Sequence, residues 1–479
     1  MRTSATGLTL ALALIGLVSA CRPPAAALEA RKLLDRGELK AARSAIDRAI
    51  QQQPSDAELQ RVRIEVQLAQ GDRKAAVQTY RGWLDRVGQD RAMAHHLAVS
   101  LLSWALSHRD PVLRLAALQG ARQTDASELE RAVARRLDDP DEVVRSWAAV
   151  AMSQTPAGSD ALGRQLASPS AAARAVAVEN LARIAGQTAR STLRRFVEDP
   201  ASGVRSALAR GVGRLGQDWA LALLKPLVTD RDRGVRLAAI SALGRVGHAT
   251  DETLRMVRTA LQDPYIGIRL AAVLTLADLQ GPQARPRLRQ LAGTDDLIPA
   301  LQAATRLARM GEDQPVLDAI ARALVDRQWT VRAAGCNAGS SLHGANPVAR
   351  KLISDRGLVD PEPRVRIAAA RAVLALGDSS RAARSAALLQ GLACRQTSES
   401  MESLCLQAAE VLLRANNRVG LRQLERLVRQ GISPSHRREA LRIALTGGGL
   451  LQLAVDALAD SDLRVAVAAA VELYRRTTD

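Results

Sequence analysis

The feature that most constrains the fold of this chain is a spacing of acid and arginine that returns about every thirty residues. Several segments place an aspartate six residues before an arginine, and an Ala-, Val- and Leu-rich run follows each. A chain that repeats one unit at this interval builds an array in which each unit covers the apolar face of the next. The pairs are Asp139–Arg145, Asp199–Arg205, Asp230–Arg236, Asp263–Arg269, Asp326–Arg332 and Asp360–Arg366.

Each unit is predicted to be two helices joined by a short turn. In the segment "LVTDRDRGVRLAAISALGRVG" (227–247), a first helix leads to an Asp-type turn and an Ala-rich second helix follows. Aromatic residues make up only 2% of the chain, which leaves little for a β-sheet core. Ser168 and Ala300 replace the acid and the arginine in two units. The second helices are expected to stop at glycines such as Gly216, Gly247 and Gly377.

The pattern "DPxxxVRxxAxxALGxxG" resembles HEAT repeats, in particular the short bacterial kind named after bilin lyases. The resemblance implies an all-α fold, a right-handed α-solenoid of helical hairpins with about twelve HEAT-like repeats over residues 91–479. It also implies that the matching Asp and Arg residues form a ladder inside the stack. A catalytic pair is needed once, whereas this pair recurs. We therefore predict a structural role, in which each Asp accepts backbone N–H groups and each Arg bridges adjacent units.

Residues 25–90 carry a second kind of repeat. The segments "LLDRGELKAARSAIDRAIQQQP" and "QLAQGDRKAAVQTYRGWLDRVG" align, so that Gly37 matches Gly71 and Ala42 matches Ala76. Their glycine, alanine and large apolar positions resemble the tetratricopeptide repeat, although Trp83 replaces a small residue. The resemblance implies two tetratricopeptide-like hairpins that precede the solenoid.

The first twenty residues are expected to be a signal peptide, with Arg2 before an apolar run too short to span a bilayer. The ending "LVSAC" resembles a bacterial lipobox, which implies lipidation of Cys21 and a short lipidated N-terminal linker over residues 21–24. Arg22 in place of Asp implies an anchor in the outer membrane facing the periplasm, so the expected location is the bacterial cell envelope. An ordinary exported protein with an incidental cysteine is the alternative.

Neither the remaining cysteines nor any known catalytic motif indicates a chemical activity. Cys394 and Cys405 flank a polar segment and could form a disulfide in an oxidising compartment, whereas Cys336 fits a small buried residue. The chain contains no CxxC, GxSxG, HExxH or P-loop pattern. We therefore expect no catalytic residues, no metal site and no cofactor.

The formal net charge of +18 predicts attraction to acidic partners. A stripe of arginines nine residues after the ladder positions is expected late in the second helices, on the concave side. Arginine near a helix C-terminus also simply favours the helix dipole, which is the competing interpretation. Aromatic side chains before two ladder arginines could likewise anchor a partner or fill a gap between units. The candidate partner-binding residues are Arg183, Arg214, Arg245, Arg309, Tyr265 and Trp329.

The sequence favours a non-enzymatic, membrane-tethered cell-envelope scaffold that binds protein partners with acidic surfaces through its concave face. One alternative is a bilin-lyase-like protein that handles tetrapyrroles. Another is a basic solenoid that binds an anionic polymer such as nucleic acid, which the export signal disfavours.

Overall fold

In a computed structural model, residues 23–124, 127–215, 218–247, 249–342, 346–394, 398–447 and 451–478 are described. All regular secondary structure within these ranges is helical, and consecutive helices pair into hairpins. The predicted all-α solenoid is therefore confirmed. The predicted signal peptide, Cys21 and Gly216 lie outside the described residues.

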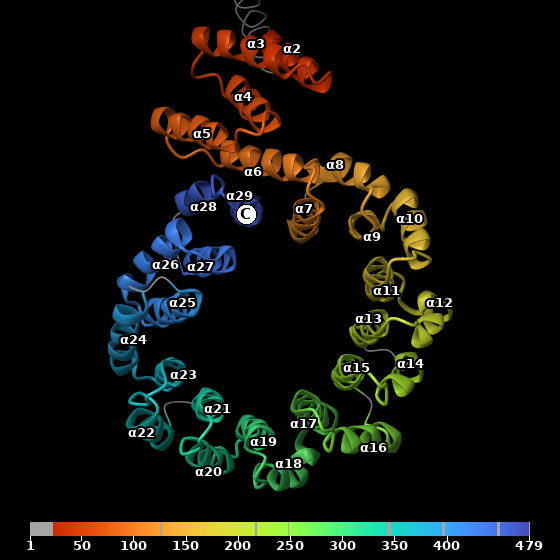
Figure 1. Cartoon of the computed structure of the whole chain (residues 1–479), viewed down its shortest axis with the longest axis vertical. Helices are drawn as coiled ribbons and strands as arrows, with labels where there is room; N and C mark the ends of the chain where they lie inside the picture. Colours follow the sequence, from red (N-terminus) through yellow and green to blue (C-terminus); the bar gives the residue numbers. More distant parts are fainter. Residues whose placement is uncertain are drawn as a thin grey trace, which may run out of the picture. The chain divides into compact units, whose positions relative to one another are not determined.

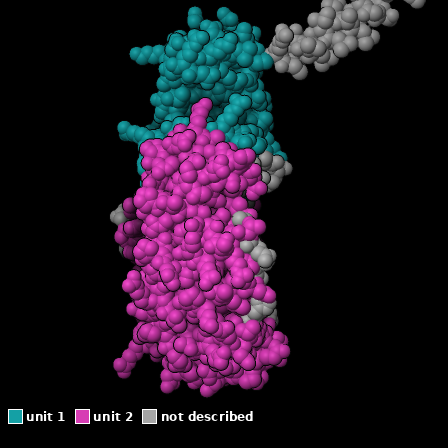
Figure 2. Space-filling model, turned by 90° about the vertical axis from the view of Figure 1, so that its right-hand side faces the viewer, with its two compact units in different colours: residues 1–132, 450–479 teal, residues 133–449 magenta. Residues whose placement is uncertain are grey.

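The chain divides into two compact units (Figure 2). Unit 1 contains the residues up to 132 together with those from 450 onward, and unit 2 contains residues 133–449. The chain thus leaves unit 1 once and returns to it near its C-terminus.

Unit 1 begins with antiparallel hairpins in which each helix packs against the next. Gly37 and Gly71 have φ angles of 77° and 80° at the matching turns, a backbone conformation that favours glycine. The unit's helices are α2 (Ala25–Asp35), α3 (Leu39–Gln52), α4 (Ala57–Ala69), α5 (Arg73–Val87), α6 (Arg91–Leu106), α7 (Pro111–Thr124), the 3₁₀ turn η1 (Ser127–Leu129), α28 (Leu451–Ala457) and α29 (Leu463–Thr478). The boundary with unit 2 falls within α8 (Glu130–Ala134).

The C-terminal hairpin of the chain completes unit 1. Helix α29 packs against both α6 and α7. A Cβ atom at Gly120 of α7 would lie 2.4 Å from Val471 of α29, so the absence of a side chain there permits the close approach. Arg81 of α5 pairs with Asp456 of α28 at 2.5 Å. These contacts join segments more than three hundred residues apart in sequence.

Unit 2 is a two-layered stack of hairpins (Figure 1). Second helices from α9 to α23 line the inner side of its arc, and first helices from α10 to α22 form the outer side. The second helices are α9 (Glu142–Ala151), α11 (Ala171–Ala185), α13 (Ser202–Gly213), α15 (Arg233–Val246), α17 (Ile266–Gln280), α19 (Leu297–Arg309), α21 (Trp329–Gly339), α23 (Pro363–Ala375), α25 (Glu399–Arg414) and α27 (Pro434–Thr446).

The first helices of unit 2 are shorter on average, and several are broken into α and 3₁₀ segments. They are η2 (Arg135–Asp138), α10 (Pro156–Leu166), η3 (Gly186–Ala189) with α12 (Arg190–Arg194) and η4 (Arg195–Glu198), α14 (Trp219–Leu227), α16 (Asp251–Ala260), η5 (Gly281–Ala284) with α18 (Arg285–Ala292), α20 (Gln314–Ala323), α22 (Pro347–Arg356), α24 (Ser379–Ala393) and α26 (Arg418–Gln430).

Helix α15 shows why these residues form a second helix. Its N-cap, Asp232, accepts hydrogen bonds from the backbone N–H groups of the next turn, and its C-cap, Gly247, has a φ of 82°. Buried apolar residues recur at Val235, Ala239 and Leu243, which gives the helix one face against its neighbours. The opposite side of α15 forms part of the inner surface of unit 2 (Figure 1).

Candidate functional site

The aspartates and arginines of the ladder connect consecutive repeats. Arg205 donates from Nη1 to the carbonyl oxygen of Asp199 at 2.7 Å, within its own repeat. It also donates from Nε and Nη2 to the carboxylate of Asp230, in the following repeat, at 2.7 and 2.9 Å. The pair six residues apart is therefore not an ion pair itself, because each arginine binds the carboxylate of the next repeat.

The same arrangement recurs along unit 2. Each ladder aspartate also accepts the backbone N–H two residues ahead, for example Asp230 from Asp232 at 2.8 Å. Arg269 departs slightly from this arrangement. Its Nε donates to Asp296 at 2.8 Å, in the repeat that lacks a ladder arginine. The bidentate pairs are Arg174–Asp199, Arg205–Asp230, Arg236–Asp263 and Arg332–Asp360.

At the ends of the predicted ladder only part of the pattern is present. Arg366 donates to the carbonyl oxygen of Asp360 at 2.6 Å. Arg145 donates to the carbonyl oxygen of Asp139 at 2.5 Å and pairs with Glu142 at 3.4 Å. Because Ser168 occupies the acid position of the following repeat, its hydroxyl binds Glu142 instead, at 2.9 Å.

In the repeat with Ala300, another residue makes the hydrogen bond of the missing ladder arginine. The repeat pattern does not predict this residue. Arg322 of α20 donates to the carbonyl oxygen of Thr294 at 3.0 Å, the position that a ladder arginine would otherwise fill. The Asp326 carboxylate accepts the N–H of Gln328 at 2.7 Å and has no arginine partner among the described residues. An arginine from a first helix thus replaces one half of the missing rung.

A similar replacement occurs near the end of unit 2. Glu402 of α25 is buried and accepts hydrogen bonds from the backbone of Ile432 and Ser433, at 2.5 and 3.0 Å, and from Nδ1 of His436 at 2.9 Å. Glu402 thus accepts the backbone N–H groups of the turn before α27, where the repeat has Gly431 in place of the ladder aspartate. No spacing rule within one repeat predicts this residue, since the acid comes from the preceding second helix.

The ladder lowers the pKa of its carboxyl groups. For Asp230 the largest cause is the hydrogen bond from Arg205, which holds its pKa below the usual value. For Asp199, Asp263 and Asp360, burial raises the pKa, but the paired arginine and the backbone N–H lower it by more.

These shifts predict a loss of stability in acid. A carboxyl group with a lowered pKa in the folded state stabilises the fold above its unfolded pKa of about 3.9. That contribution is lost as the pH falls through the folded pKa values. We expect the urea midpoint of unfolding to decline steeply below about pH 4, and to decline less steeply in an Asp230→Asn variant. An equally steep decline in that variant would contradict the assignment of the acid sensitivity to the ladder carboxyl groups.

The predicted arginine stripe lies on the inner layer but is not uniform. Arg183, Arg245 and Arg309 are exposed and form no ion pair with any described residue. Arg214 is also exposed, yet it pairs with Glu179 at 2.9 Å. The matching position of α17 holds Asp278, which interrupts the stripe.

The inner layer nevertheless carries a clear excess of positive charge. From α11 to α23, the acids on second helices are Glu179 and Asp278, and Asp278 lies 3.4 Å from Arg306. An arginine-rich surface of this kind attracts acidic groups. The arginines outside the ladder in or directly after these helices are Arg183, Arg210, Arg214, Arg233, Arg245, Arg306, Arg309, Arg364 and Arg371.

The two predicted aromatic residues lie on turns between first and second helices. Tyr265 is the N-cap residue of α17, and the guanidinium of Arg233 lies 5.1 Å from its ring centroid. Trp329 is the first residue of α21, and the guanidinium of Arg364 lies 4.9 Å from its ring. Both side chains stay exposed. The structure therefore places them at one end of the hairpins, apart from the late second-helix positions of the stripe.

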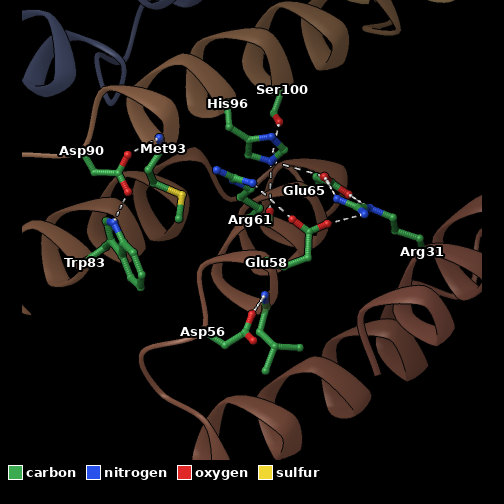
Figure 3. Close-up of polar contacts among 11 residues, drawn as sticks. Arg31, Asp56, Glu58, Arg61, Glu65, Trp83, Asp90, Met93, His96 and Ser100 are labelled. Atoms are coloured by element: carbon green, nitrogen blue, oxygen red, sulfur yellow. Dashed lines mark hydrogen bonds and ion pairs between the residues drawn. The ribbon is translucent and has the colours of Figure 1, made fainter. Parts of the chain in front are cut away.

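Unit 1 contains a separate polar cluster (Figure 3). Arg31 of α2 binds Glu58 and Glu65 of α4 at 2.6 and 2.9 Å, and Glu65 lies 3.3 Å from Nε2 of His96. Burial raises the pKa of Glu65, but the hydrogen bonds from His96 and Arg31 lower it by more. The cluster borders a groove of about 760 Å³ on α4 and α6.

The Ser100 hydroxyl of this cluster lies 3.2 Å from His96, which raises the question of a nucleophile. Both Ser100 and Glu65 approach the same ring nitrogen, Nε2. A Ser–His–acid relay needs one partner on each ring nitrogen. The arrangement therefore ties α2, α4 and α6 together and does not form a relay.

Cys394, the residue directly after α24, and Cys405 of α25 form a disulfide, with their Cα atoms 5.1 Å apart. Cys336 is a buried free cysteine, and burial raises the pKa of its thiol to about 12. Across the described ranges, no group of three or more His, Cys, Asp or Glu side chains is placed to hold a metal ion. No described helix combines the length and apolarity that crossing a bilayer requires.

Comparisons with known proteins identify the repeat. The profile of the HEAT-repeat family matches residues 159–244 and 223–307. No curated protein matches the chain. Human deoxyhypusine hydroxylase in complex with glycerol is a structural neighbour with 21% identity and a TM-score of 0.25, over 53% of this chain and 94% of that one.

Kap121p is another neighbour, with 11% identity and a TM-score of 0.36 over 85% of this chain. The match spans about half of Kap121p, 54% of its length. Neither superposition is close enough to bear on function. The family match covers the repeats from α10 to α19, which include three of the four bidentate ladder pairs.

Proposed function

We propose that this α-solenoid with HEAT repeats is a non-enzymatic scaffold that binds an acidic surface of a cell-envelope protein through the inner face of unit 2. A lipid on Cys21 would tether it to a bacterial membrane, the outer membrane on its periplasmic side. The observation that carries the binding proposal is the arginine excess on the second helices from α11 to α23.

The distribution of these arginines favours a protein partner over a uniform polyanion. The ladder arginines from Arg174 to Arg332 are bound to carboxylates, whereas Arg183, Arg245 and Arg309 present unpaired charge on three alternate second helices. Glu179 and Asp278 interrupt the row. A polymer with evenly spaced phosphates gains most from an uninterrupted basic row, while a protein surface can match a mixed pattern and gain specificity from it.

The competing tetrapyrrole proposal follows from the resemblance to bilin lyases and has a direct test. A purified chain that binds a tetrapyrrole, or that changes the absorbance of one, would favour it. The nucleic-acid alternative requires selectivity for a sequence or a structure, because any arginine-rich surface binds DNA at low salt.

A charge reversal of the inner face tests the proposed function. The variant Arg183→Glu, Arg245→Glu, Arg309→Glu places acids where the partner's acids would bind, and it breaks no described ion pair. We expect a photo-crosslinking residue at Ser241, on α15, to capture a discrete partner in cells. We expect the reversal to lower that yield by about tenfold or more, since several charge pairs become repulsive.

The outer layer offers a matched control, Arg190→Glu, Arg194→Glu, Arg258→Glu, on α12 and α16. It makes the same change in net charge, and its three arginines are exposed. Equal losses of crosslinking yield in the two variants would mean that only the net charge of the chain matters, which would contradict the inner-face proposal. Cys21→Ser in the same cells should release the chain from the membrane fraction, and persistence there would contradict the anchor.

A further inference from the structure

A cavity in unit 2 lies where α25 ends and α26 begins. Its volume is about 660 Å³, which is within the usual range for sites that bind small molecules. The walls come from α25, the turn after it, the start of α26 and the end of α27, and these three helices pack against one another. The lining residues that determine its chemistry are Leu413, Arg414, Asn416, Arg418, Arg442 and Ile443.

Asn416 has an unusual backbone conformation. Among the described residues it is the only one other than glycine with a positive φ, which is 56°. At the ends of α15, α19 and α23 this conformation belongs to Gly247, Gly311 and Gly377, with φ angles of 82°, 89° and 87°. The conformation costs free energy for a residue with a Cβ atom, although asparagine tolerates it better than most.

The backbone alone would therefore favour glycine at the end of α25, and the amide side chain of Asn416 calls for another explanation. This amide lines the cavity and forms no hydrogen bond with any described residue. It leaves a donor and an acceptor available to a molecule inside the cavity.

The cavity has more arginine than acid. Arg414, Arg418 and Arg442 line it, and Glu410 is the only acid among its described lining residues. Glu410 pairs with Arg371 at 2.8 Å and with Arg414 at 2.7 Å, so two arginines already compensate its charge. Arg418 is exposed and forms no ion pair with any described residue.

The neighbouring groups leave this excess in place. Arg442 pairs with Glu439, which does not line the cavity. When Arg371 and Glu439 are included, four arginines lie opposite two acids. Arg418 is also the first residue of α26, and the N-terminus of a helix adds a partial positive charge. The cavity therefore attracts an anion.

The other part of the lining is apolar. Leu413 of α25, Leu421 of α26 and Ile443 of α27 contribute to it, and Ile443 is buried. We propose that the cavity binds a small amphiphilic anion. Arg414, Arg418 and Arg442 bind its phosphate or carboxylate group, and its apolar part lies against Leu413 and Ile443. An acidic side chain of a protein would reach the arginines but would leave the apolar wall uncovered.

The inference goes beyond the proposed function, because the cavity lies on α25–α27 and the proposed protein-binding arginines lie on α11–α23. Isothermal titration calorimetry of the full chain with Cys21→Ser tests it with octyl phosphate, octanoate, inorganic phosphate and octanol. We expect an amphiphilic anion to bind at least tenfold more tightly than inorganic phosphate or octanol, since each of these lacks one half of the ligand. The tighter of octyl phosphate and octanoate identifies the acidic group. Equal binding of inorganic phosphate, or of octanol, would overturn the inference.

Two substitutions test the residues of the site. Arg418→Ala should weaken binding of the tighter amphiphile about tenfold, because a charged hydrogen bond is lost. Asn416→Gly should weaken it about fivefold without lowering the urea midpoint of unfolding, since glycine suits the positive φ. Unchanged binding in Asn416→Gly and Arg418→Ala would contradict the site.

A matched control is Arg258→Ala, which makes the same change in net charge at an exposed position of α16. It should bind as the parent chain does, and an equal loss there would reduce the effect to net charge and overturn the inference. The inner-face variant Arg183→Glu, Arg245→Glu, Arg309→Glu separates the two proposals, because it should lose partner crosslinking and keep most of its amphiphile binding. If neither amphiphile binds at millimolar concentration and Arg418→Ala lowers partner crosslinking, the cavity is a protein contact and the inference is wrong.

Discussion

Replacing Arg205 with alanine is expected to lower the local free energy of unfolding around α13 and α15 by about 3–5 kcal/mol. The side chain is only 7% exposed and makes a bidentate pair with Asp230. Its removal leaves the Asp230 carboxylate, which is 10% exposed, with one backbone hydrogen bond, from the N–H of Asp232. It also removes the donor from the Asp199 carbonyl. Because repeat arrays open in parts, native-state hydrogen exchange of the α13 and α15 amides is the appropriate measurement.

The ladder provides its own control for this prediction. Arg145 keeps the bond to its own turn carbonyl, but the next repeat has Ser168 in place of the ladder aspartate, and Arg145 is 25% exposed. Arg145→Ala should therefore cost only about 1 kcal/mol. A double-mutant cycle of Arg205→Ala with Asp230→Asn should show that the two losses of stability are not additive, since both substitutions remove the same ion pair. Equal costs for Arg205 and Arg145 would show that the carboxylate pair contributes nothing.

The repeat spacing was enough to predict the α-solenoid and the positions of the ladder, because every hairpin of a stack must bury the same face. It could not assign the ladder's partners. The acid nearest to Arg205 in sequence is Asp199, six residues away, but its ion pair is with Asp230, 25 residues ahead. The side-chain direction at the start of a second helix decides this, and the spacing does not encode it.

The residues that sequence reasoning missed all make contacts outside the repeat pattern. Arg322 and Glu402 fill gaps left by substitutions in a neighbouring repeat, so each acts where its own repeat shows no need for it. Asp278 lies at the stripe position of a repeat that has no arginine there, so a pattern of arginines alone does not reveal it. The packing of α29 on α6 and α7 joins repeats at opposite ends of the sequence, and no local periodicity reports such a contact.

Removal of the Cys394–Cys405 disulfide is the other change with a large expected effect. The bond closes a short loop between α24 and α25, with a sequence separation of 11 residues. Loop-closure entropy for a loop of this length predicts a loss of about 3 kcal/mol. The variant Cys394→Ala, Cys405→Ala should therefore unfold at a lower urea concentration. The difference should be greatest for probes in α24 and α25, because the disulfide links only those two helices.

A reducing agent separates the effect of the bond from the effect of the substitutions. It should lower the urea midpoint of the parent chain to that of the variant and leave the variant unchanged. Cys336 supplies the internal control, because it is buried and its thiol pKa is raised, so it should resist alkylation until the protein unfolds. If reduction leaves the parent's midpoint unchanged while mass spectrometry verifies two new thiols, the bond does not stabilise the fold. The packing of α24 on α25 would then be sufficient without it.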